Sequence, residues 1–177
     1  MPISERLLVH AAVVVDLQFS QYNTGEAVGD VYVSIEDLAG SAFNDTLFGT
    51  SYGNQLFGRD GADFLYGRGG NDYLNGGSGA DRLDGGVDND TLRGGTHGDT
   101  FVFNAGRDVV EDFRPNDLDR LLIEDGLYSG GLTPQEVVST YASVVGTMVV
   151  FDFGTGATLT LQGITSLTGL AGALDLM

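Results

Sequence analysis

The chain has no cysteine and few basic residues, and both scarcities restrict what it can do. Without cysteine it can form no disulfide, no thiolate metal site and no cysteine nucleophile. Only 8 lysines and arginines stand against 25 acidic residues among 177, which gives a formal net charge of −17. Such a chain repels nucleic acid and anionic membranes, and its self-repulsion opposes compaction unless cations neutralise it. We therefore expect no nucleic-acid partner.

Long apolar runs are lacking too. The longest one near the N-terminus is LLVHAAVVV at 7–15, which is far shorter than a membrane span. We interpret it as a β-strand that carries His10 at the surface. A signal-peptide core is the weaker interpretation, because no convincing cleavage site follows. The sequence therefore predicts no membrane insertion.

Residues and motifs for catalysis are equally scarce. The chain has two histidines, His10 and His97, and neither His-Glu-x-x-His nor Gly-x-Ser-x-Gly occurs. His97 lies in a glycine-rich turn, where a structural role is expected. We predict that the chain is not an enzyme and that any catalytic domain lies outside it.

What the chain does have is a nine-residue repeat that fills residues 40–111 without a gap. Its eight frames read GSAFNDTLF, GTSYGNQLF, GRDGADFLY, GRGGNDYLN, GGSGADRLD, GGVDNDTLR, GGTHGDTFV and FNAGRDVVE. Glycine holds position one in the first seven frames, and position eight is always apolar. Position six is Asn54 in the second frame and aspartate in the others: Asp45, Asp63, Asp72, Asp81, Asp90, Asp99 and Asp108. A flexible linker would not keep an apolar residue in register, so we expect an ordered repeat fold.

Each frame is expected to form a six-residue turn followed by a very short strand, and two frames complete one coil. Like positions then recur every 18 residues. One inner row should hold Leu47, Leu65, Leu83 and Phe101, and the facing row Leu56, Leu74, Leu92 and Val110. One apolar residue in nine makes a thin core, which cannot offset the ordering entropy of nine residues. The repeat therefore needs another source of stability.

The position-six carboxylates provide that source if cations bind between them. Aspartates 18 residues apart become stacked neighbours, and unpaired they repel one another. Ca²⁺ takes six to eight oxygen ligands, and carboxylates and backbone carbonyls of a glycine-rich turn can supply them. Mg²⁺ suits the arrangement less, because it needs a smaller octahedral site and keeps its waters. We expect about four to six calcium ions, and six would move the formal charge from −17 to −5 (−17 + 12).

The flanking segments differ in character from the repeat. Residues 1–39 carry two strand-like segments, at 13–17 and 31–38, and we interpret them as N-terminal capping strands. VYVSIEDLA, at 31–39, also fits one extra frame with Leu38 at position eight. From Asp112 the register is expected to decay.

The C-terminal segment, residues 112–177, is interpreted as a second cap. In it, 132–146 predicts a helix with a capping box of Thr133 and Glu136. TMVVFDFGTGATLTLQGI predicts a hairpin that turns at 154–156. The fold class predicted for the whole chain is all-β, a right-handed parallel β-roll with β-rich caps and one short helix.

The frames resemble the RTX, or hemolysin-type calcium-binding, repeat of proteins exported by bacterial type I secretion. VYVSIEDLAGSAFNDTLFG resembles the usual lead-in to such repeats, and DTFVFNAGRDVVEDFRPNDLDRL resembles the exit in the C-terminal domain of serralysin-type and related secreted proteins. The resemblance covers about residues 13–165. It implies secretion to the extracellular space and folding on calcium.

The resemblance also implies which atoms bind each ion. One loop gives the carbonyls of positions two and four and its position-six carboxylate; the loop 18 residues later gives the carbonyls of positions one and three and its own carboxylate. The four most regular sites would be Arg59, Gly61 and Asp63 with Gly76, Ser78 and Asp81; Arg68, Gly70 and Asp72 with Gly85, Val87 and Asp90; Gly77, Gly79 and Asp81 with Gly94, Thr96 and Asp99; and Gly86, Asp88 and Asp90 with Phe103, Ala105 and Asp108. In the first two frames Phe43 and Tyr52 replace glycine at position four and Asn54 lacks the charge, so sites there, including any at Asp45, are expected to be weak or empty.

Three functions remain open from the sequence. The leading one is a calcium-binding module that supports secretion and stability of an exported bacterial protein. Its partners would be calcium, the type I secretion machinery and a covalently attached catalytic domain outside this sequence. The second is a carbohydrate-binding or adhesion module; the scattered basic residues Arg59, Arg68, Arg82 and Arg93 argue against an anionic glycan. The third is a small hydrolase or inhibitor with an unfamiliar site.

Overall fold

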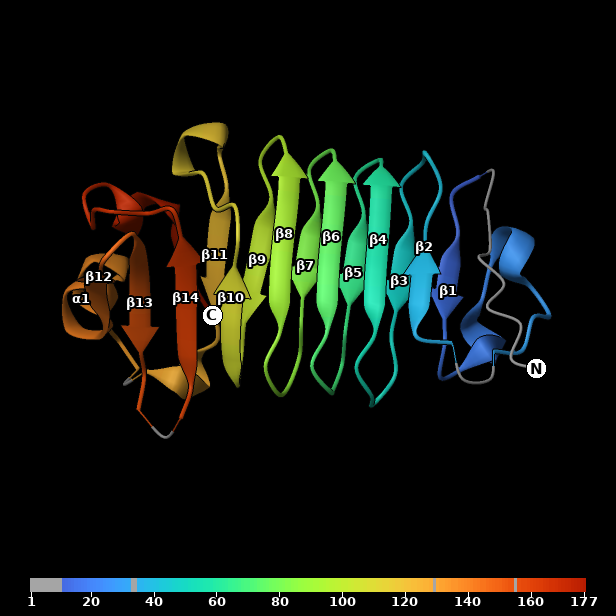
Figure 1. Ribbon diagram of the computed structural model, residues 1–177, viewed down its shortest axis with the longest axis horizontal. Helices are drawn as coiled ribbons and strands as arrows, with labels where there is room; N and C mark the ends of the chain where they lie inside the picture. Colours follow the sequence, from blue (N-terminus) through green and yellow to red (C-terminus); the bar gives the residue numbers. More distant parts are fainter. Residues whose placement is uncertain (1–10, 33–34, 129, 155) are drawn as a thin grey trace.

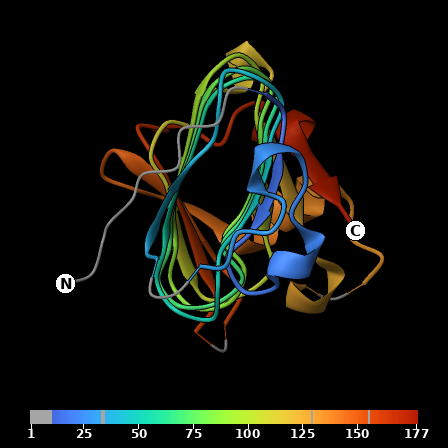
Figure 2. The same cartoon turned by 90° about the vertical axis from the view of Figure 1, so that its right-hand side faces the viewer.

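The computed structural model describes residues 11–32, 35–128, 130–154 and 156–177. Two sheets face each other, and the chain passes from one to the other and back, so that successive coils stack along one axis (Figure 1). Seen along that axis, the coils of the repeat lie one behind another (Figure 2). The predicted all-β parallel β-roll with one short helix is confirmed.

The first sheet is parallel throughout, and the second has an antiparallel end. In spatial order the first contains β1 (Val14–Asp16), β3 (Thr46–Phe48), β5 (Phe64–Tyr66), β7 (Arg82–Asp84), β9 (Thr100–Phe103), β11 (Arg120–Ile123) and β15 (Leu174–Leu176). The second contains β12 (Ala142–Val145), β13 (Met148–Asp152), β14 (Thr158–Gln162), β10 (Arg107–Val110), β8 (Thr91–Thr96), β6 (Tyr73–Ser78), β4 (Gln55–Asp60) and β2 (Asp37–Ala39). The helix is α1 (Pro134–Tyr141), and the 3-10 turns are η1 (Ser20–Tyr22), η2 (Gly25–Ala27), η3 (Pro115–Asp117), η4 (Asp125–Leu127) and η5 (Leu170–Ala173).

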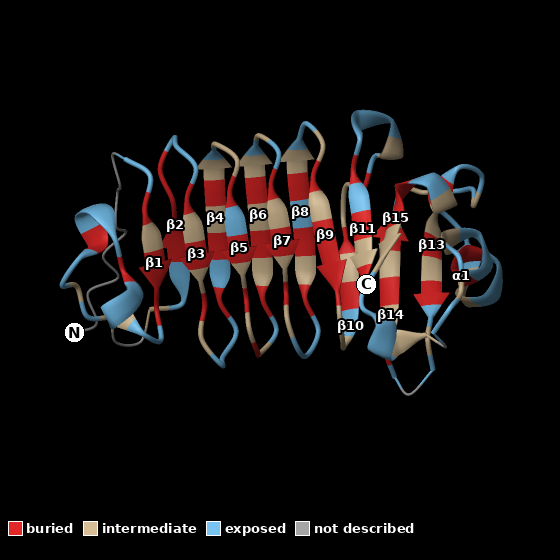
Figure 3. Ribbon diagram, turned by 180° about the vertical axis from the view of Figure 1, so that it is seen from behind, coloured by how far each residue is buried: buried red, intermediate tan, exposed pale blue. Residues whose placement is uncertain are grey.

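The core consists of the two predicted inner rows. Strand pairing aligns Leu47 with Leu65, Leu65 with Leu83, and so on at 18-residue intervals in both sheets. The position-eight side chains of the repeat are at most 1% exposed. Along most strands of the repeat, buried residues alternate with more exposed ones (Figure 3). The rows place every turn of the repeat at one of the two long edges of the roll.

The N-terminal flank agrees with the sequence in part. Strand β1 lies within the predicted segment 13–17, and the extra frame is confirmed, because Leu38 pairs with Leu56. The strand predicted at 31–38 is wrong in extent: β2 covers only Asp37–Ala39, and residues 33–34 lie outside the described part. The prediction for His10 falls in residues 1–10, which also lie outside it.

The nine-residue register is lost after Asp112, as the sequence predicts, but both sheets continue beyond that point. Strand β11 continues the first sheet with Leu121 opposite Phe101, and β14 continues the second with Leu161 opposite Val110. The first step is twenty residues instead of eighteen, since the loop before β11 contains the extra turn η3. Both sheets thus extend beyond the repeat.

The predicted helix at 132–146 is too long. Its capping box is present, with the Glu136 N–H donating to Thr133 Oγ1, but the helix ends at Tyr141. Residues 142–145 form β12, which pairs antiparallel with β13, and Gly146, with φ of 63°, allows the turn between them. The predicted hairpin of β13 and β14 is confirmed; residue 155 in its turn lies outside the described residues.

Candidate metal centre

The position-six residues form two buried columns, here called ladders, one along each edge of the roll. In the first ladder, the Asp45 N–H donates to Asp63 Oδ1 at 2.8 Å, Asp63 to Asp81 at 2.8 Å and Asp81 to Asp99 at 2.9 Å. In the second ladder, Asn54 donates to Asp72 at 2.6 Å, Asp72 to Asp90 at 2.8 Å and Asp90 to Asp108 at 3.0 Å. The carboxylates therefore stack at the predicted 18-residue spacing, each held through one oxygen.

The second carboxylate oxygen is left without a partner in the interior of both ladders. Oδ2 is buried and accepts no hydrogen bond in Asp63, Asp72, Asp81, Asp90 and Asp108. A buried carboxylate oxygen without a partner is unfavourable, because it has lost water and gained nothing in return. Five such atoms in two columns are oxygen donors that a metal ion could use, and carboxylate oxygens suit a hard divalent cation.

Burial also raises the pKa of the ladder carboxyls. Removal from water raises the pKa to about 7 for Asp63, Asp72 and Asp99 and to about 8 for Asp108, and the backbone N–H donors only partly oppose this. Neighbouring ladder carboxylates add to the rise. The fold thus holds these groups in an environment that disfavours their negative charge unless a cation is present.

Glycine at position one gives the carboxylate its space. A Cβ atom on Gly67 would lie 2.2 Å from Asp72 Oδ2 and 2.5 Å from the Gly85 carbonyl oxygen. The same conflict arises between Gly76 and Asp81, at 2.2 Å. A larger residue at position one would therefore displace the carboxylate.

The turns of frames three to seven share one backbone conformation, which frames one and two lack. In these five, positions two and four both have positive φ: Arg59 and Gly61, Arg68 and Gly70, Gly77 and Gly79, Gly86 and Asp88, and Gly95 and His97. In frame eight only Gly106, at position four, does. Frames one and two have Ser41, Phe43, Thr50 and Tyr52 there, all with ordinary φ. The carbonyl orientations common to frames three to seven are therefore absent from the first two turns.

Strand pairing brings together the loops that the sequence assigns to each site. Arg59 lies beside Gly77 and Asp60 beside Ser78, which joins frames three and five, and Ser78 beside Thr96 joins frames five and seven. The Val87 N–H donates to the Arg68 carbonyl at 2.9 Å, which joins frames four and six. Among the described residues no three acidic or histidine side chains gather at one point, so an ion would need backbone carbonyls besides two carboxylates.

His97 does not join a ladder. Its ring is exposed, and Nδ1 lies 2.8 Å from the carbonyl oxygen of Thr96 in its own turn. This agrees with the expected structural role.

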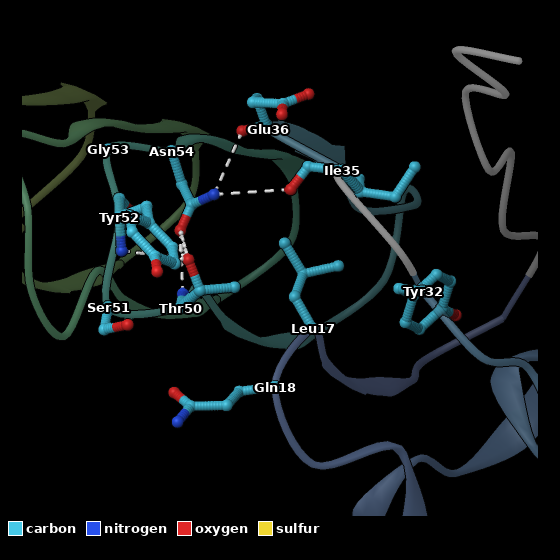
Figure 4. Close-up of a pocket in the computed structure, with 10 residues that line it drawn as sticks. All are labelled: Leu17, Gln18, Tyr32, Ile35, Glu36, Thr50, Ser51, Tyr52, Gly53 and Asn54. Carbon is cyan, nitrogen blue, oxygen red and sulfur yellow. Dashed lines mark hydrogen bonds between the residues drawn. The ribbon is translucent and has the colours of Figure 1, made fainter. Parts of the chain in front are cut away.

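At the N-terminal end, hydroxyl groups complete both ladders. Ser41 donates its N–H to Asp45 Oδ2 at 2.5 Å and its hydroxyl at 3.0 Å. Thr50 does the same for Asn54 Oδ1, at 2.7 and 3.1 Å, and Asn54 Nδ2 donates long bonds to the carbonyls of Ile35 and Glu36 (Figure 4). The pocket in that view, of about 590 Å³, is lined by Thr50, Asn54 and neighbouring residues that include Leu17 and Tyr32. Polar groups of the protein thus fill the first turn.

At the C-terminal end the first ladder has a member that the sequence analysis missed. The Asp99 N–H donates to Asp119 Oδ1 at 2.9 Å, and Asp119 Oδ2 accepts from the Arg114 N–H at 2.6 Å. The sequence carries a signal for it, since Asp119 and Leu121 repeat the spacing of positions six and eight. The two-residue insertion before them hid that signal.

Comparison with known proteins agrees with this geometry. The family model described as RTX calcium-binding nonapeptide repeat (4 copies) matches residues 39–74 and 75–110. The comparison with curated protein sequences finds no match. The extracellular lipase LipA of Serratia marcescens has a similar fold, with a TM-score of 0.53 at 17% identity; the match covers 83% of this chain and 41% of the lipase. The AlgE6R3 subunit of the Azotobacter vinelandii mannuronan C5-epimerase is 28% identical over 77% of this chain and 80% of the subunit, with a TM-score of 0.34.

Proposed function

We propose that four calcium ions bind along the two ladders and drive folding of the chain outside the cell. The match of residues 39–110 to the family model of RTX calcium-binding nonapeptide repeats supports this proposal. The sites lie between Asp63 and Asp81, Asp81 and Asp99, Asp72 and Asp90, and Asp90 and Asp108. The backbone carbonyls assigned from the sequence complete each set of ligands. In the last site these include the carbonyls of Phe103 and Ala105.

The observation that carries this proposal is the distribution of the unpartnered oxygens. In each proposed site the aspartate that comes first in the chain has a buried Oδ2 without a hydrogen bond: Asp63, Asp81, Asp72 and Asp90. Asp45 and Asn54, which come first in the two N-terminal pairs, have donors from Ser41 and Thr50 instead. The backbone agrees, because the first three proposed sites join two turns of the shared left-handed conformation, and the last joins one such turn to frame eight. Two independent features therefore separate the interior turns from the first one.

The proposed role of the ions is to supply the stability that the thin core lacks. A bound calcium ion provides two positive charges to a pair of buried carboxylates. Four ions would change the formal charge from −17 to −9 (−17 + 8). The carboxylates then act as ligands instead of repelling one another, and the binding free energy becomes folding free energy.

This dependence suits export in an unfolded state. Extracellular calcium modules bind with dissociation constants of roughly 10⁻⁴–10⁻³ M, which is far above cytosolic calcium. We propose that the chain stays unfolded inside the cell, passes through a type I secretion channel and folds outside. The likeness of the fold to a lipase described as extracellular supports this setting. None of the described helices is long and apolar enough to span a membrane.

We further propose that the module serves a larger secreted enzyme. The chain spans only 41% of the lipase chain it matches. The described ladders contain no nucleophile–base pair, and their carboxylates are assigned to calcium. Chemistry would then belong to another part of the protein.

Circular dichroism tests the folding part of the proposal. We expect the β-sheet signal to form cooperatively as calcium rises from about 10⁻⁵ to 10⁻² M, bracketing that affinity range. The same concentration of Mg²⁺ should not substitute. Equal β-sheet content in excess chelator would refute the proposal.

Export is tested separately, in a bacterial strain that carries a type I system. The whole chain should reach the medium, and a truncation without residues 112–177 should stay in the cell. Equal export of both would remove the secretion role and leave calcium-dependent folding untouched.

A further inference from the structure

The first ladder offers a fifth place for a cation, between Asp99 and Asp119. The turn of frame seven has the conformation of the proposed sites, with φ of 107° at Gly95 and 81° at His97. Asp119 accepts the Asp99 N–H just as each interior aspartate accepts the one before it. One side of a fifth site is therefore built to the same pattern.

The opposite side is occupied by Arg114. Its Nη1 donates to the Gly95 carbonyl at 2.7 Å, and that carbonyl holds position two, a ligand position in the proposed sites. Its backbone N–H takes the second oxygen of Asp119. The Asp112 carboxylate accepts the N–H groups of Gly94 and Gly95, at 2.9 and 3.0 Å, and its Oδ2 lies 4.0 Å from Arg114 Nη1.

The contrast with the interior is clear at the level of single atoms. Asp63 and Asp81 each keep an Oδ2 without a partner, but both oxygens of Asp119 accept hydrogen bonds. The bond to Asp119 Oδ2 comes from the Arg114 backbone. The guanidinium group instead places a fixed positive charge at the Gly95 carbonyl and near the Asp112 carboxylate. That charge can neutralise acceptors that would otherwise attract an ion. The Arg114 side chain is 48% exposed, which leaves its Nη groups within reach of solvent.

We propose that the positive charge of Arg114 takes the place of calcium at the step of the first ladder between Asp99 and Asp119. The series of ion sites then ends there. This rests on the proposed function, because it assumes that the interior steps bind calcium. Arg114 thereby sets the number of ions. It also holds the loop 112–119 against the turn of frame seven at any calcium concentration.

Native mass spectrometry of the whole chain in calcium tests this by counting ions. We expect four for the wild type, five for Arg114→Ser and four for Arg114→Lys, which keeps the charge. Arg107→Ser is the charge-matched control, because Arg107 is exposed and, within the described residues, its side chain makes a single long hydrogen bond, to the Gly156 carbonyl at 3.4 Å. It should keep four.

Each other result has a definite meaning. An unchanged count for Arg114→Ser, or a fifth ion in the Arg107→Ser control, overturns the role of Arg114 while leaving the proposed function intact. So does an Arg114→Ser chain that stays unfolded by circular dichroism at about 10 mM calcium, well above the expected dissociation constants, while Arg114→Lys folds. A wild type that binds no calcium overturns the proposed function itself.

Discussion

Asp45 and Asp81 hold the same place in their frames and are similarly buried, at 1% and 2% exposure, yet their carboxylates have different surroundings. Both oxygens of Asp45 are bound, by the N–H of Val13 and by Ser41. Asp81 accepts one N–H and keeps Oδ2 free of partners. Burial alone therefore does not distinguish these two carboxylates; the unpartnered oxygen does.

This difference predicts opposite results for the same substitution. Asp81→Asn should remove at least one ion and weaken calcium binding by about tenfold or more, because Asp81 serves two proposed sites and calcium affinity follows ligand charge. Asp45→Asn should keep the wild-type ion count, although it weakens the contact with Ser41. Isothermal titration calorimetry measures both. Equal loss of ions in the two variants would contradict the assignment of sites.

The position-one glycines give a second test at the residue level. Gly67→Ala would put a Cβ 2.2 Å from Asp72 Oδ2, so the carboxylate must move and calcium affinity should fall about tenfold or more. Gly126→Ala is the matched control, since no heavy atom lies within 4 Å of its added Cβ. A calcium titration followed by circular dichroism should show a shifted midpoint for the first variant alone. A normal midpoint for Gly67→Ala would mean that the carboxylate position is unimportant.

Within the repeat, the position of most residues can be predicted from the sequence. Where the repeat is interrupted, it cannot. The spacing of nine is enough to identify the stacked aspartates and both leucine rows. Asp119 escapes this pattern because the loop before it is two residues longer. The role of Arg114 cannot be deduced from the sequence, since it depends on where a long side chain meets the Gly95 carbonyl.

At the level of structural elements, the stability that each ladder gives the ion-free chain should depend on pH. The pKa of the ion-free ladder carboxyls is raised from 3.8 to about 6 for Asp81 and Asp90, about 7 for Asp63, Asp72 and Asp99, and about 8 for Asp108, mainly by burial. The folded chain then binds protons more tightly than the unfolded one between about pH 4 and pH 8. The stability that protons provide is complete below the unfolded pKa and is lost as the pH rises through the folded pKa values.

Acid should therefore partly replace calcium. In chelator, the β-sheet signal and the thermal midpoint should be higher at pH 5 than at pH 8. The affinity of the chain for calcium should fall as the pH is lowered from 8 to 5, because calcium must then displace protons from the carboxylates. Asp16 acts in the opposite sense only below about pH 4: burial raises its pKa, but the bond to Arg68 and the nearby N–H donors bring it below 3.8. An ion-free chain that loses structure from pH 8 to pH 5 would contradict this account.

Elements outside the repeat are predicted in kind more reliably than in extent. Thr133 and Glu136 mark the start of α1 correctly, because a capping box is a local signal. The end of the helix is missed, since residues 142–145 pair with β13 and tertiary pairing outweighs local helix propensity. In the same way, among the described residues of the segment 31–38 only Asp37 and Leu38 belong to the sheet, where β2 pairs with β4.

At the scale of the whole molecule, the two sheets run continuously from β1 and β2 through the repeat to β15 and β12. The ends differ from the middle in what stabilises them. The C-terminal part adds large buried side chains such as Phe151 and Leu159, and the first turn is completed by Ser41 and Thr50. From β4 to β8 each strand has one buried leucine, and only β9, with Phe101, Val102 and Phe103, has more; two rows of carboxylates run beside them. Calcium should therefore matter most between β4 and β10.

Hydrogen exchange with and without calcium, resolved along the chain, tests the central claim most directly. With about 5 mM calcium, above the expected dissociation constants, the amides of residues 55–110 should exchange slowly and together. In chelator at pH 8 the same amides should exchange as fast as in an unfolded chain. Slow exchange of residues 55–110 in chelator would contradict the account, because the roll would then be stable without the ions that the ladders are proposed to bind.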